Sequence, residues 1–418
     1  MSILFYNIFL LLFKISVRVS ALFNPKAAKW LKGRKNIFER LQKAIPKDAK
    51  VIWMHCSSLG EFEQGRPVLE KLRSLYPDHK ILLTFFSPSG YEVKKDYDGV
   101  DWVFYLPIDS PKNAKRFVEI VHPALIIFVK YEFWYYYLKK IKYRNIPLLL
   151  VSALFRKDMS FFKWYGALQR KMLSRFDHLF VQNESSKKLI DKIGLASICS
   201  ISGDTRFDRV LEIAENFEPI PLIEKFIGSD KCIVAGSTWK EDEEILSQLN
   251  LSEKKIKLII APHEINESHL DEIKKLFPTS ATLLELKTGN QQPVTGNVLI
   301  INSIGLLSRL YKYASIAYVG GALKPMGVHN VLEAAVYGKP VLFGPYYKKY
   351  QEAVELIEAG GGFSFPDINS LKEKKDQLLN NENIYSKTCN ASEKYVASKE
   401  GATQKIIQFI QEKRLLTN

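Results

Sequence analysis

Short apolar runs rich in β-branched and aromatic residues alternate with helical patterns along most of this chain, and this alternation limits the folds that the chain can adopt. Parallel strands that are buried on both faces give such runs, and each pair of parallel strands needs a long crossover, usually a helix. The sequence therefore predicts an α/β protein with parallel sheets. The predicted strands are 51–56, 80–85, 102–105, 124–129, 147–152 and 178–181, followed by 232–235, 256–261, 298–302, 316–319, 340–343 and 362–365.

A break in the alternation divides these strands into two sets. Segment 216–221 reads Asn-Phe-Glu-Pro-Ile-Pro, and two prolines in three residues end a helix or a strand. We predict two Rossmann-like domains, 46–215 and 222–385, that face each other across a cleft, and a helical tail, 386–418, that packs back on the first domain. Ligands of open parallel sheets bind beyond the carboxyl ends of the strands. Polar residues in those loops are therefore the candidates for a site.

The charge of the chain is concentrated in its first half. Up to residue 210 there are 36 Lys and Arg against 19 Asp and Glu, which gives +17, whereas the remainder has 24 against 26, which gives −2. This asymmetry predicts an anionic partner for the first half: nucleic acid, a membrane surface or a phosphorylated substrate. Charge alone does not choose among them.

Residues 1–45 are predicted to associate with a membrane. Residues 3–13 are almost wholly apolar, but eleven residues are too few to cross a bilayer core, which needs about 20. No cleavage site follows, and the basic residues come after the apolar run, so we favour an uncleaved shallow anchor over a signal peptide. Segment 27–43 interleaves apolar and basic residues, which is typical of an interfacial helix, although an ordinary solvated basic helix has the same pattern.

The four cysteines lie far apart and form no C-x-x-C motif. This spacing indicates neither a zinc cluster nor a disulfide framework, and it suits a reducing, cytosolic setting. The acidic run 241–244 falls on a predicted helix and is interpreted as a solvated face, and no metal-binding loop is evident. We therefore expect neither a metal nor a cofactor.

Two carboxylates occupy equivalent places in the first domain. Glu61 follows the strand 51–56 near the start of a helix, and Glu132 follows the strand 124–129. The helix dipole favours the ionised form of a carboxylate at that position, as a general base requires. Plain helix-start charges are the alternative. Arg206, next to the domain junction, suits a carboxylate or phosphate ligand, or an interdomain salt bridge.

In the second domain the segment 318–333 is the densest candidate. It reads as a strand, a turn with Gly320 and Gly321, and the start of a helix that Asn330 caps. The glycines would let a ligand approach the backbone, and Glu333 would accept two ribose hydroxyls. The turn 236–238 is a weaker candidate for a phosphate, and His263 lies at another strand end. The chain lacks the P-loop and the dinucleotide-binding glycine motif.

Taken together, these residues resemble the 3-deoxy-D-manno-octulosonate (Kdo) transferases of Gram-negative envelope synthesis, which have the GT-B glycosyltransferase fold. The resemblance covers essentially the whole chain. Its motifs are 53–61 (WMHCSSLGE), 105–109 (YLPID), 131–134 (YEFW), 203–208 (GDTRFD), 261–263 (APH), 304–305 (IG) with 310–311 (LY), and 320–322 (GGA) through 329–333 (HNVLE).

The resemblance implies transfer of Kdo from CMP-Kdo to the lipid A precursor lipid IVA, with inversion, at the cytoplasmic face of the inner membrane. It implies that Glu61 is the general base and that Glu132 and Arg206 stabilise the transition state. The partners would be the CMP-Kdo donor, the lipid acceptor and an anionic membrane surface, and not nucleic acid. The implied nucleotide-binding residues are Pro262, His263, Ile304, Gly305, Leu306, Gly320, Gly321, Asn330, Val331, Leu332 and Glu333.

Some positions depart from the family pattern. Arg206 replaces the usual Lys, Val328 interrupts the Gly-Gly-His-Asn element, Leu306 replaces a Glu, and Lys130-Tyr131 replaces Glu-Thr. These changes affect nucleotide contacts more than the type of reaction. Two alternatives remain open: another GT-B enzyme that uses a UDP- or GDP-sugar, and a non-catalytic basic module that binds anionic lipid or nucleic acid.

Overall fold

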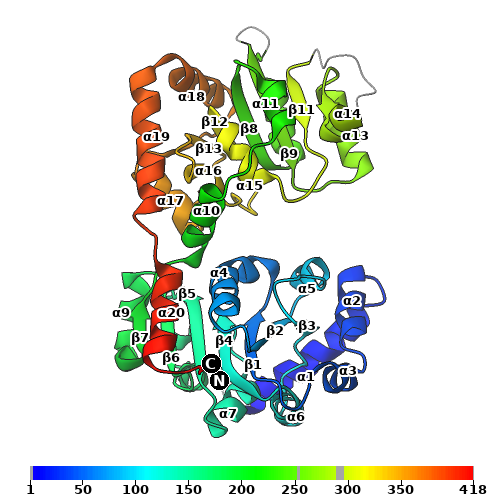
Figure 1. The fold of residues 1–418 in the computed structure, drawn as a ribbon, viewed down its shortest axis with the longest axis vertical. Helices are drawn as coiled ribbons and strands as arrows, with labels where there is room; N and C mark the ends of the chain where they lie inside the picture. The colour runs from blue at the N-terminus through cyan, green and yellow to red at the C-terminus, as the bar shows by residue number, and fades with distance from the viewer. Residues whose placement is uncertain (1–2, 252–254, 289–295, 418) are drawn as a thin grey trace. The chain divides into compact units, whose positions relative to one another are not determined.

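The structure is a computed structural model that describes residues 3–251, 255–288 and 296–417, so residues 1–2 of the predicted anchor and residue 418 of the predicted tail lie outside it. The chain divides into two compact units, one of Met1–Asp208 with Gly401–Asn418 and one of Arg209–Glu400 (Figure 1). The proline-rich break at 216–221 comprises the loop between α10 and α11 and the first residue of α11, whereas the boundary between the units lies inside α10.

The first unit contains a seven-stranded parallel sheet in the order β3-β2-β1-β4-β5-β6-β7. Its strands are β1 (Val51–Cys56), β2 (Lys80–Phe85), β3 (Trp102–Tyr105), β4 (Pro123–Val129), β5 (Leu148–Ala153), β6 (His178–Val181) and β7 (Cys199–Ile201). Its helices are α1 (Ile3–Ser20), α2 (Pro25–Gly33), α3 (Ile37–Ala44), α4 (Leu59–Leu75), α5 (Pro88–Lys94), α6 (Pro111–Val121), α7 (Tyr135–Tyr143), α8 (Ala167–Leu173), α9 (Glu184–Lys192), the start of α10 (Thr205–Glu215) and α20 (Ala402–Glu412).

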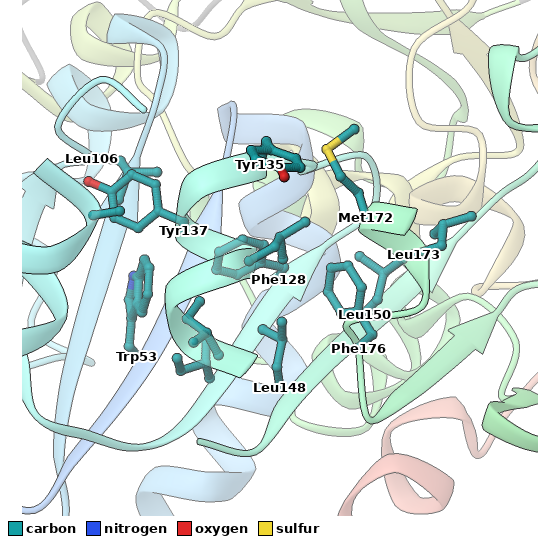
Figure 2. Packing of buried hydrophobic residues seen from close by; sticks show 14 of the residues in the cluster. Trp53, Leu106, Phe128, Tyr135, Tyr137, Leu148, Leu150, Met172, Leu173 and Phe176 are labelled. Atoms are coloured by element: carbon teal, nitrogen blue, oxygen red, sulfur yellow. The ribbon is translucent and has the colours of Figure 1, made fainter. Parts of the chain in front are cut away.

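Successive residues of β1 point to opposite faces of this sheet, as the period of two requires. Trp53 belongs to the core on one face, where Phe128 and Tyr137 also pack (Figure 2). Met54 belongs to the core on the other face, which α4 and α20 cover. Both faces are therefore apolar, which explains the continuous apolar runs of the sequence.

Serine-proline pairs begin two of the helices in this unit. The side chains of Ser87 and Ser110 accept backbone N–H groups in the first turns of α5 and α6, and a proline follows each serine. Proline suits the first helical position because the N–H that it lacks would have had no partner there.

The N-terminal segment packs on the first unit and differs in part from the prediction. One helix, α1, is long and apolar enough to cross a membrane by length and composition, and only Tyr6 and Leu10 in it are buried. The predicted interfacial helix at 27–43 is two helices, α2 and α3, and Trp30, Ile37 and Leu41 are buried in the protein. The interfacial interpretation of that segment was wrong, because its apolar residues face the protein core.

The second unit contains another seven-stranded parallel sheet, in the order β10-β11-β9-β8-β12-β13-β14. Its strands are β8 (Lys231–Thr238), β9 (Ile256–Pro262), β10 (Ala281–Thr282), β11 (Val298–Ile300), β12 (Ile316–Val319), β13 (Val341–Phe343) and β14 (Gly362–Ser364). Its helices are the rest of α10, α11 (Pro221–Ile227), α12 (Lys240–Ser247), α13 (Glu267–Leu276), α14 (Leu283–Thr288), α15 (Leu307–Leu310), α16 (Leu332–Ala335), α17 (Gln351–Glu358), α18 (Ile368–Asn380) and α19 (Glu382–Ala397).

The predicted α/β fold with two parallel sheets is confirmed. Two strands, β7 and β10, had not been predicted. The helical tail at 386–418 comprises most of α19, which belongs to the second unit, and α20, which belongs to the first.

Candidate active site

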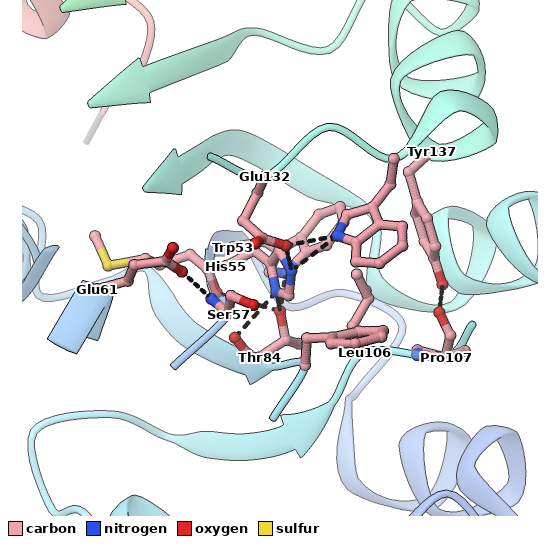
Figure 3. Close-up of polar contacts among 12 residues, drawn as sticks. Trp53, His55, Ser57, Glu61, Thr84, Leu106, Pro107, Glu132 and Tyr137 are labelled. Atoms are coloured by element: carbon pink, nitrogen blue, oxygen red, sulfur yellow. Dashed lines mark hydrogen bonds and ion pairs between the residues drawn. The ribbon is translucent and has the colours of Figure 1, made fainter. Parts of the chain in front are cut away.

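Glu61 lies in the first turn of α4, directly after the loop that ends β1. Its side chain is 9% exposed and accepts the backbone N–H of Ser57 (Figure 3). Burial and the nearby charge of Glu132 raise the pKa of Glu61 to about 8, although the Ser57 N–H and the Lys130 ammonium act in the opposite direction. The helix dipole alone would have lowered this pKa, so the sign expected from sequence was wrong: desolvation outweighs the dipole.

Glu132 belongs to a buried hydrogen-bond network formed by residues of β1, of β2 and of the loop after β4. Its Oε2 lies 2.8 Å from Nε2 of His55, which points from β1, and it accepts the indole N–H of Trp134 at 2.6 Å. On the other side of the imidazole, Nδ1 of His55 lies 2.8 Å from the Thr84 hydroxyl and 3.1 Å from the Thr84 carbonyl oxygen (Figure 3). The sequence had predicted Glu132 but neither His55 nor Trp134.

These contacts use the hydrogen-bonding capacity of the Glu132 carboxylate. Its Oε2 contacts both His55 and Trp134 of the same unit. Glu132 is therefore occupied by its own chain, which leaves Glu61 as the better placed of the two carboxylates to accept a proton.

Arg206 is paired within the first unit. Its Nε and Nη2 donate to Oδ2 of Asp204 at 3.0 and 2.7 Å, and this carboxylate also lies 3.5 Å from the side-chain amide of Gln64 on α4. Burial alone would raise the pKa of Asp204, but Arg206 and Lys130 lower it. Lys130 acts on both Glu61 and Asp204, so these charges share one region at the carboxyl ends of β1, β4 and β7.

In the second unit, three rings stack at the ends of β8 and β9. His263 stacks on both Trp239 and His329, with ring centroids 4.6 Å from each. The indole N–H of Trp239 donates to Nε2 of His329 at 3.0 Å. Burial and the neighbouring His263 lower the pKa of His329 to about 4. His329 is therefore neutral at pH 7, with its hydrogen on Nδ1.

Replacing Trp239 by Phe should lower the population of the Nδ1–H tautomer of His329. Phe keeps the stacking but removes the N–H that occupies Nε2, a hydrogen bond worth about 1 kcal/mol. The Nδ1–H form of His329 should dominate in the parent and decline in Trp239→Phe, as measured by ¹⁵N shifts of the ring nitrogens. His269, which is bound to Glu243, is the internal control. A dominant Nε2–H form in the parent would contradict the assignment.

The glycine turn after β12 is packed against its own unit. A Cβ on Gly320 would lie 2.5 Å from the Ser237 carbonyl oxygen, and Gly321, at φ +88°, would bring one within 2.7 Å of the His329 ring. The absence of a side chain therefore allows the turn to approach β8 and His329, and the contact of these glycines with a ligand stays a prediction. The N–H of Gly321 donates to Asp242 at 2.9 Å.

The acidic run 241–244 is not a solvated face. Asp242 is 1% exposed and also accepts the Tyr318 hydroxyl at 2.7 Å and the Trp239 N–H at 2.9 Å. Glu243 is equally buried and contacts the Thr238 hydroxyl and His269, both at 2.8 Å. Segment 236–238 belongs to β8, so the predicted phosphate turn is also wrong.

The other predicted residues lie in loops of the same sheet. Pro262 ends β9, while Ile304, 92% exposed, and Gly305, at φ +91°, precede α15. Asn330 accepts the N–H of Leu332 at 3.2 Å and donates to Glu333 at 3.0 Å. The remaining positions contribute little side chain to solvent: Val331 and Leu332 are fully buried, and Leu306 is half-buried.

The two units, each with a parallel sheet and polar loops at the carboxyl ends of its strands, define the GT-B class of glycosyltransferase fold. A solved structure with this fold, UDP-GlcNAc 2-epimerase from Neisseria meningitidis bound to UDP-GlcNAc, superposes with a TM-score of 0.61 at 18% identity, covering 87% of this chain and 100% of that one. At such identity the likeness shows the fold alone.

Sequence comparison narrows the class to one family. Residues 35–209 match the family model described as 3-deoxy-D-manno-octulosonic-acid transferase (kdotransferase). The 3-deoxy-D-manno-octulosonic acid transferase of Aquifex aeolicus is 31% identical over 354 residues, covering 82% of this chain and 91% of that protein. The transferase of the same name from Chlamydia trachomatis serovar A is 27% identical, covering 80% of each. The chain belongs to the 3-deoxy-D-manno-octulosonic acid transferase family and is a Kdo glycosyltransferase.

Proposed function

We propose that this enzyme transfers Kdo from CMP-Kdo to lipid IVA, the tetraacylated lipid A precursor, with inversion at the anomeric carbon. The observation that carries the proposal is Glu61, a buried carboxylate of raised pKa at the carboxyl end of β1 in a member of this family. Such a carboxylate is matched to general-base work near neutral pH. The proposal includes no metal and no cofactor.

In the proposed step, Glu61 takes the proton of an acceptor hydroxyl while the hydroxyl oxygen forms a bond to the anomeric carbon of Kdo. The bond from that carbon to the phosphate oxygen breaks, and its electron pair leaves with CMP. Glu132, held by His55, is proposed to stabilise the charge that develops in the transition state. Arg206 supplies a guanidinium, but Asp204 neutralises part of its charge, so its role is positional as much as electrostatic.

The second unit is proposed to bind the nucleotide. The exposed Ile304 side chain and the positive-φ Gly305 form an open loop next to α15, suited to an apolar base face. Glu333 interacts electrostatically with Tyr311, whose hydroxyl lies against Gly236 at the end of β8. His263 and its stacked neighbours stand at the end of the adjacent strand. These loops share the carboxyl edge of one sheet, where open α/β sheets bind nucleotides.

The first unit is proposed to meet the cytoplasmic face of the inner membrane through α1. Its exposed apolar residues include Leu4, Phe5, Phe9, Leu11 and Leu12. Lys14 and Arg18 lie one turn apart on the same helix, where anionic lipid would attract them. An enzyme held in this way, as a monotopic protein or by a single N-terminal anchor, reaches an acceptor that stays in the bilayer.

The decisive experiment incubates the full chain with CMP-Kdo generated in situ and the tetraacyl lipid A precursor, followed by mass spectrometry of the lipid. One or more added Kdo masses are expected, and their number gives the number of transfers. Unchanged lipid in the presence of an active CMP-Kdo supply would overturn the proposal. A thermal-shift panel of CMP, UDP and GDP tests the donor separately: stabilisation by UDP in preference to CMP would favour a different sugar nucleotide.

The pH dependence of kcat/KM should follow the ionisation of the Glu61 carboxyl group. Below its pKa the carboxyl is protonated and cannot accept a proton, so kcat/KM should rise about tenfold per pH unit and level off near pH 8. The measurement is the initial rate at low acceptor concentration from pH 5.5 to 9.5. A rate that is flat or falls between pH 5.5 and 7.5 would contradict the raised pKa.

A further inference from the structure

A cavity of about 390 Å³ in the first unit has apolar walls and several basic side chains among its lining residues. It lies among α1, the segment that joins α2 to α3, the loop after β3, and α6. Glu39 is the one acid among the lining residues, so four cations give the lining a formal excess of three positive charges. These cations are Lys14, Arg18, Arg34 and Arg116.

Arg34 is the most deeply placed of these cations. Its Nε, Nη1 and Nη2 donate to the carbonyl oxygens of Leu106, Trp30 and Phe86 at 2.9, 3.2 and 2.8 Å, and its guanidinium carbon lies 3.7 Å from the Trp30 ring centroid. Within the described ranges no carboxylate pairs with it. Burial therefore lowers its pKa to about 9. A guanidinium has five N–H groups, so two remain for an anion that would compensate the buried charge.

The other three cations also lack a carboxylate partner in the part of the chain that the structure describes. Arg116 stacks on Phe38, 4.6 Å from the ring centroid, and its Nη2 reaches only the Gln42 side chain at 3.4 Å. Lys14 is half-buried and Arg18 is exposed. Four cations around one cavity repel one another, and a bound anion would relieve this repulsion.

The residues around the cavity indicate which kind of molecule bears the anionic group. Leu11, Leu12, Ile15 and Val19, on the same helix as Lys14 and Arg18, are 47–58% exposed. Trp30, which lines the cavity, packs on Phe86 at 5.7 Å, and Phe86 packs at 4.7 Å on Trp134, the residue that donates to Glu132. The cavity therefore adjoins an apolar helix surface and is connected by packed aromatic rings to the candidate active site.

We propose that this cavity binds the phosphate monoester head group of a membrane lipid whose acyl chains lie along α1. A monoester matches the three excess positive charges better than a diester, because its second ionisation near pH 6 brings its charge close to −2 at neutral pH. Arginine forks suit phosphate oxygens. The inference deepens the proposed function, because it gives the acceptor lipid a phosphate site, and it rests on that function for the acceptor's identity.

The test measures binding of the full chain to sucrose-loaded vesicles by co-sedimentation. One set contains phosphatidylcholine with phosphatidic acid, a monoester, and the other contains phosphatidylglycerol, a diester, at equal surface charge. We expect the parent to bind the phosphatidic acid vesicles about fivefold more tightly than the phosphatidylglycerol vesicles. This ratio is the effect of roughly one extra charge contact. Because no sugar transfer is measured, this result is independent of whether the donor is CMP-Kdo.

The variants Arg18→Gln and Arg116→Gln remove cavity charges without breaking contacts to the backbone, whereas Arg34→Gln risks misfolding. Each is expected to abolish the preference for phosphatidic acid. Lys192→Gln is the matched control, since this exposed lysine ends α9 beside β7, at the opposite edge of the sheet from β3. Circular dichroism checks that every variant is folded.

Three results would overturn the proposal. The first is equal binding of the parent to both lipids at equal surface charge. The second is a loss in Arg18→Gln and Arg116→Gln that is the same for both lipids, which would indicate general surface charge. The third is loss of the preference on adding inorganic phosphate at a concentration equal to the accessible phosphatidic acid, which would make the ligand a free phosphate rather than a lipid.

Discussion

Glu61→Gln should lower kcat for Kdo transfer by about 10³-fold, within the range of general-base contributions. Glutamine keeps the volume of the side chain and can still accept the Ser57 N–H, but it cannot take a proton from the acceptor. The measurement is a single-turnover transfer assay with the lipid product resolved by mass spectrometry. Single-turnover conditions are needed because product release from a membrane could otherwise mask the chemical step.

The fold of Glu61→Gln should be intact, and its melting temperature at pH 9 should be equal to or above that of the parent. The sign follows from the raised pKa: the folded state loses stability as the pH rises from 4.5 to about 8, the full cost is present at pH 9, and the neutral amide avoids that cost. CMP should bind unchanged. Glu63→Gln, a partly exposed neighbour on α4, is the matched control and should lose less than about twofold. Full activity of Glu61→Gln would remove Glu61 as the base.

Asp242→Ala should destabilise the second unit by about 3 kcal/mol, because it leaves three donors without their acceptor: the N–H groups of Trp239 and Gly321 and the hydroxyl of Tyr318. Buried donors without partners are among the costliest single changes. CMP affinity should fall as well, since Asp242 ties the Gly320–Gly321 turn to the start of α12. Urea denaturation and calorimetric titration with CMP measure the two effects.

The control for this variant is Glu244→Ala on the same helix. Glu244 is exposed, so its loss should change the free energy of unfolding by no more than about 0.5 kcal/mol. A parent-like unfolding curve for Asp242→Ala would show that the carboxylate does not hold the turn. Intact stability with weakened CMP binding would place its effect on the nucleotide site alone.

The strands were predictable because a buried parallel strand can be recognised from its own residues, as a short apolar run. The predicted strands 51–56, 80–85 and 102–105 coincide with β1, β2 and β3. The strands that were missed, β7 and β10, have three and two residues, too few for a periodic pattern. The interfacial interpretation of 27–43 failed for a related reason: a pattern shows that a helix has an apolar side but not what that side contacts.

The candidate site was predictable only where position along the chain sufficed. Glu61 and Glu132 follow strands, so topology identified them. His55 lies inside β1 and not in one of the loops where candidate residues are expected, yet it contacts Glu132 at 2.8 Å. Its partner comes from 77 residues further along the chain, a pairing that no local pattern reports. Asp242 was missed for the same reason, because its donors come from the end of β12 as well as from its own helix.

The return of α20 to the first unit sets an order for biosynthesis. Asp208 accepts the N–H groups of Gly401 and Thr403, and Ile406, Ile407 and Ile410 complete the core beneath α4. A ribosome that has finished the first 208 residues has therefore produced a sheet with part of one apolar face still bare. That unit begins first and is completed last, so the nascent chain must be kept from aggregating while the whole second unit is translated.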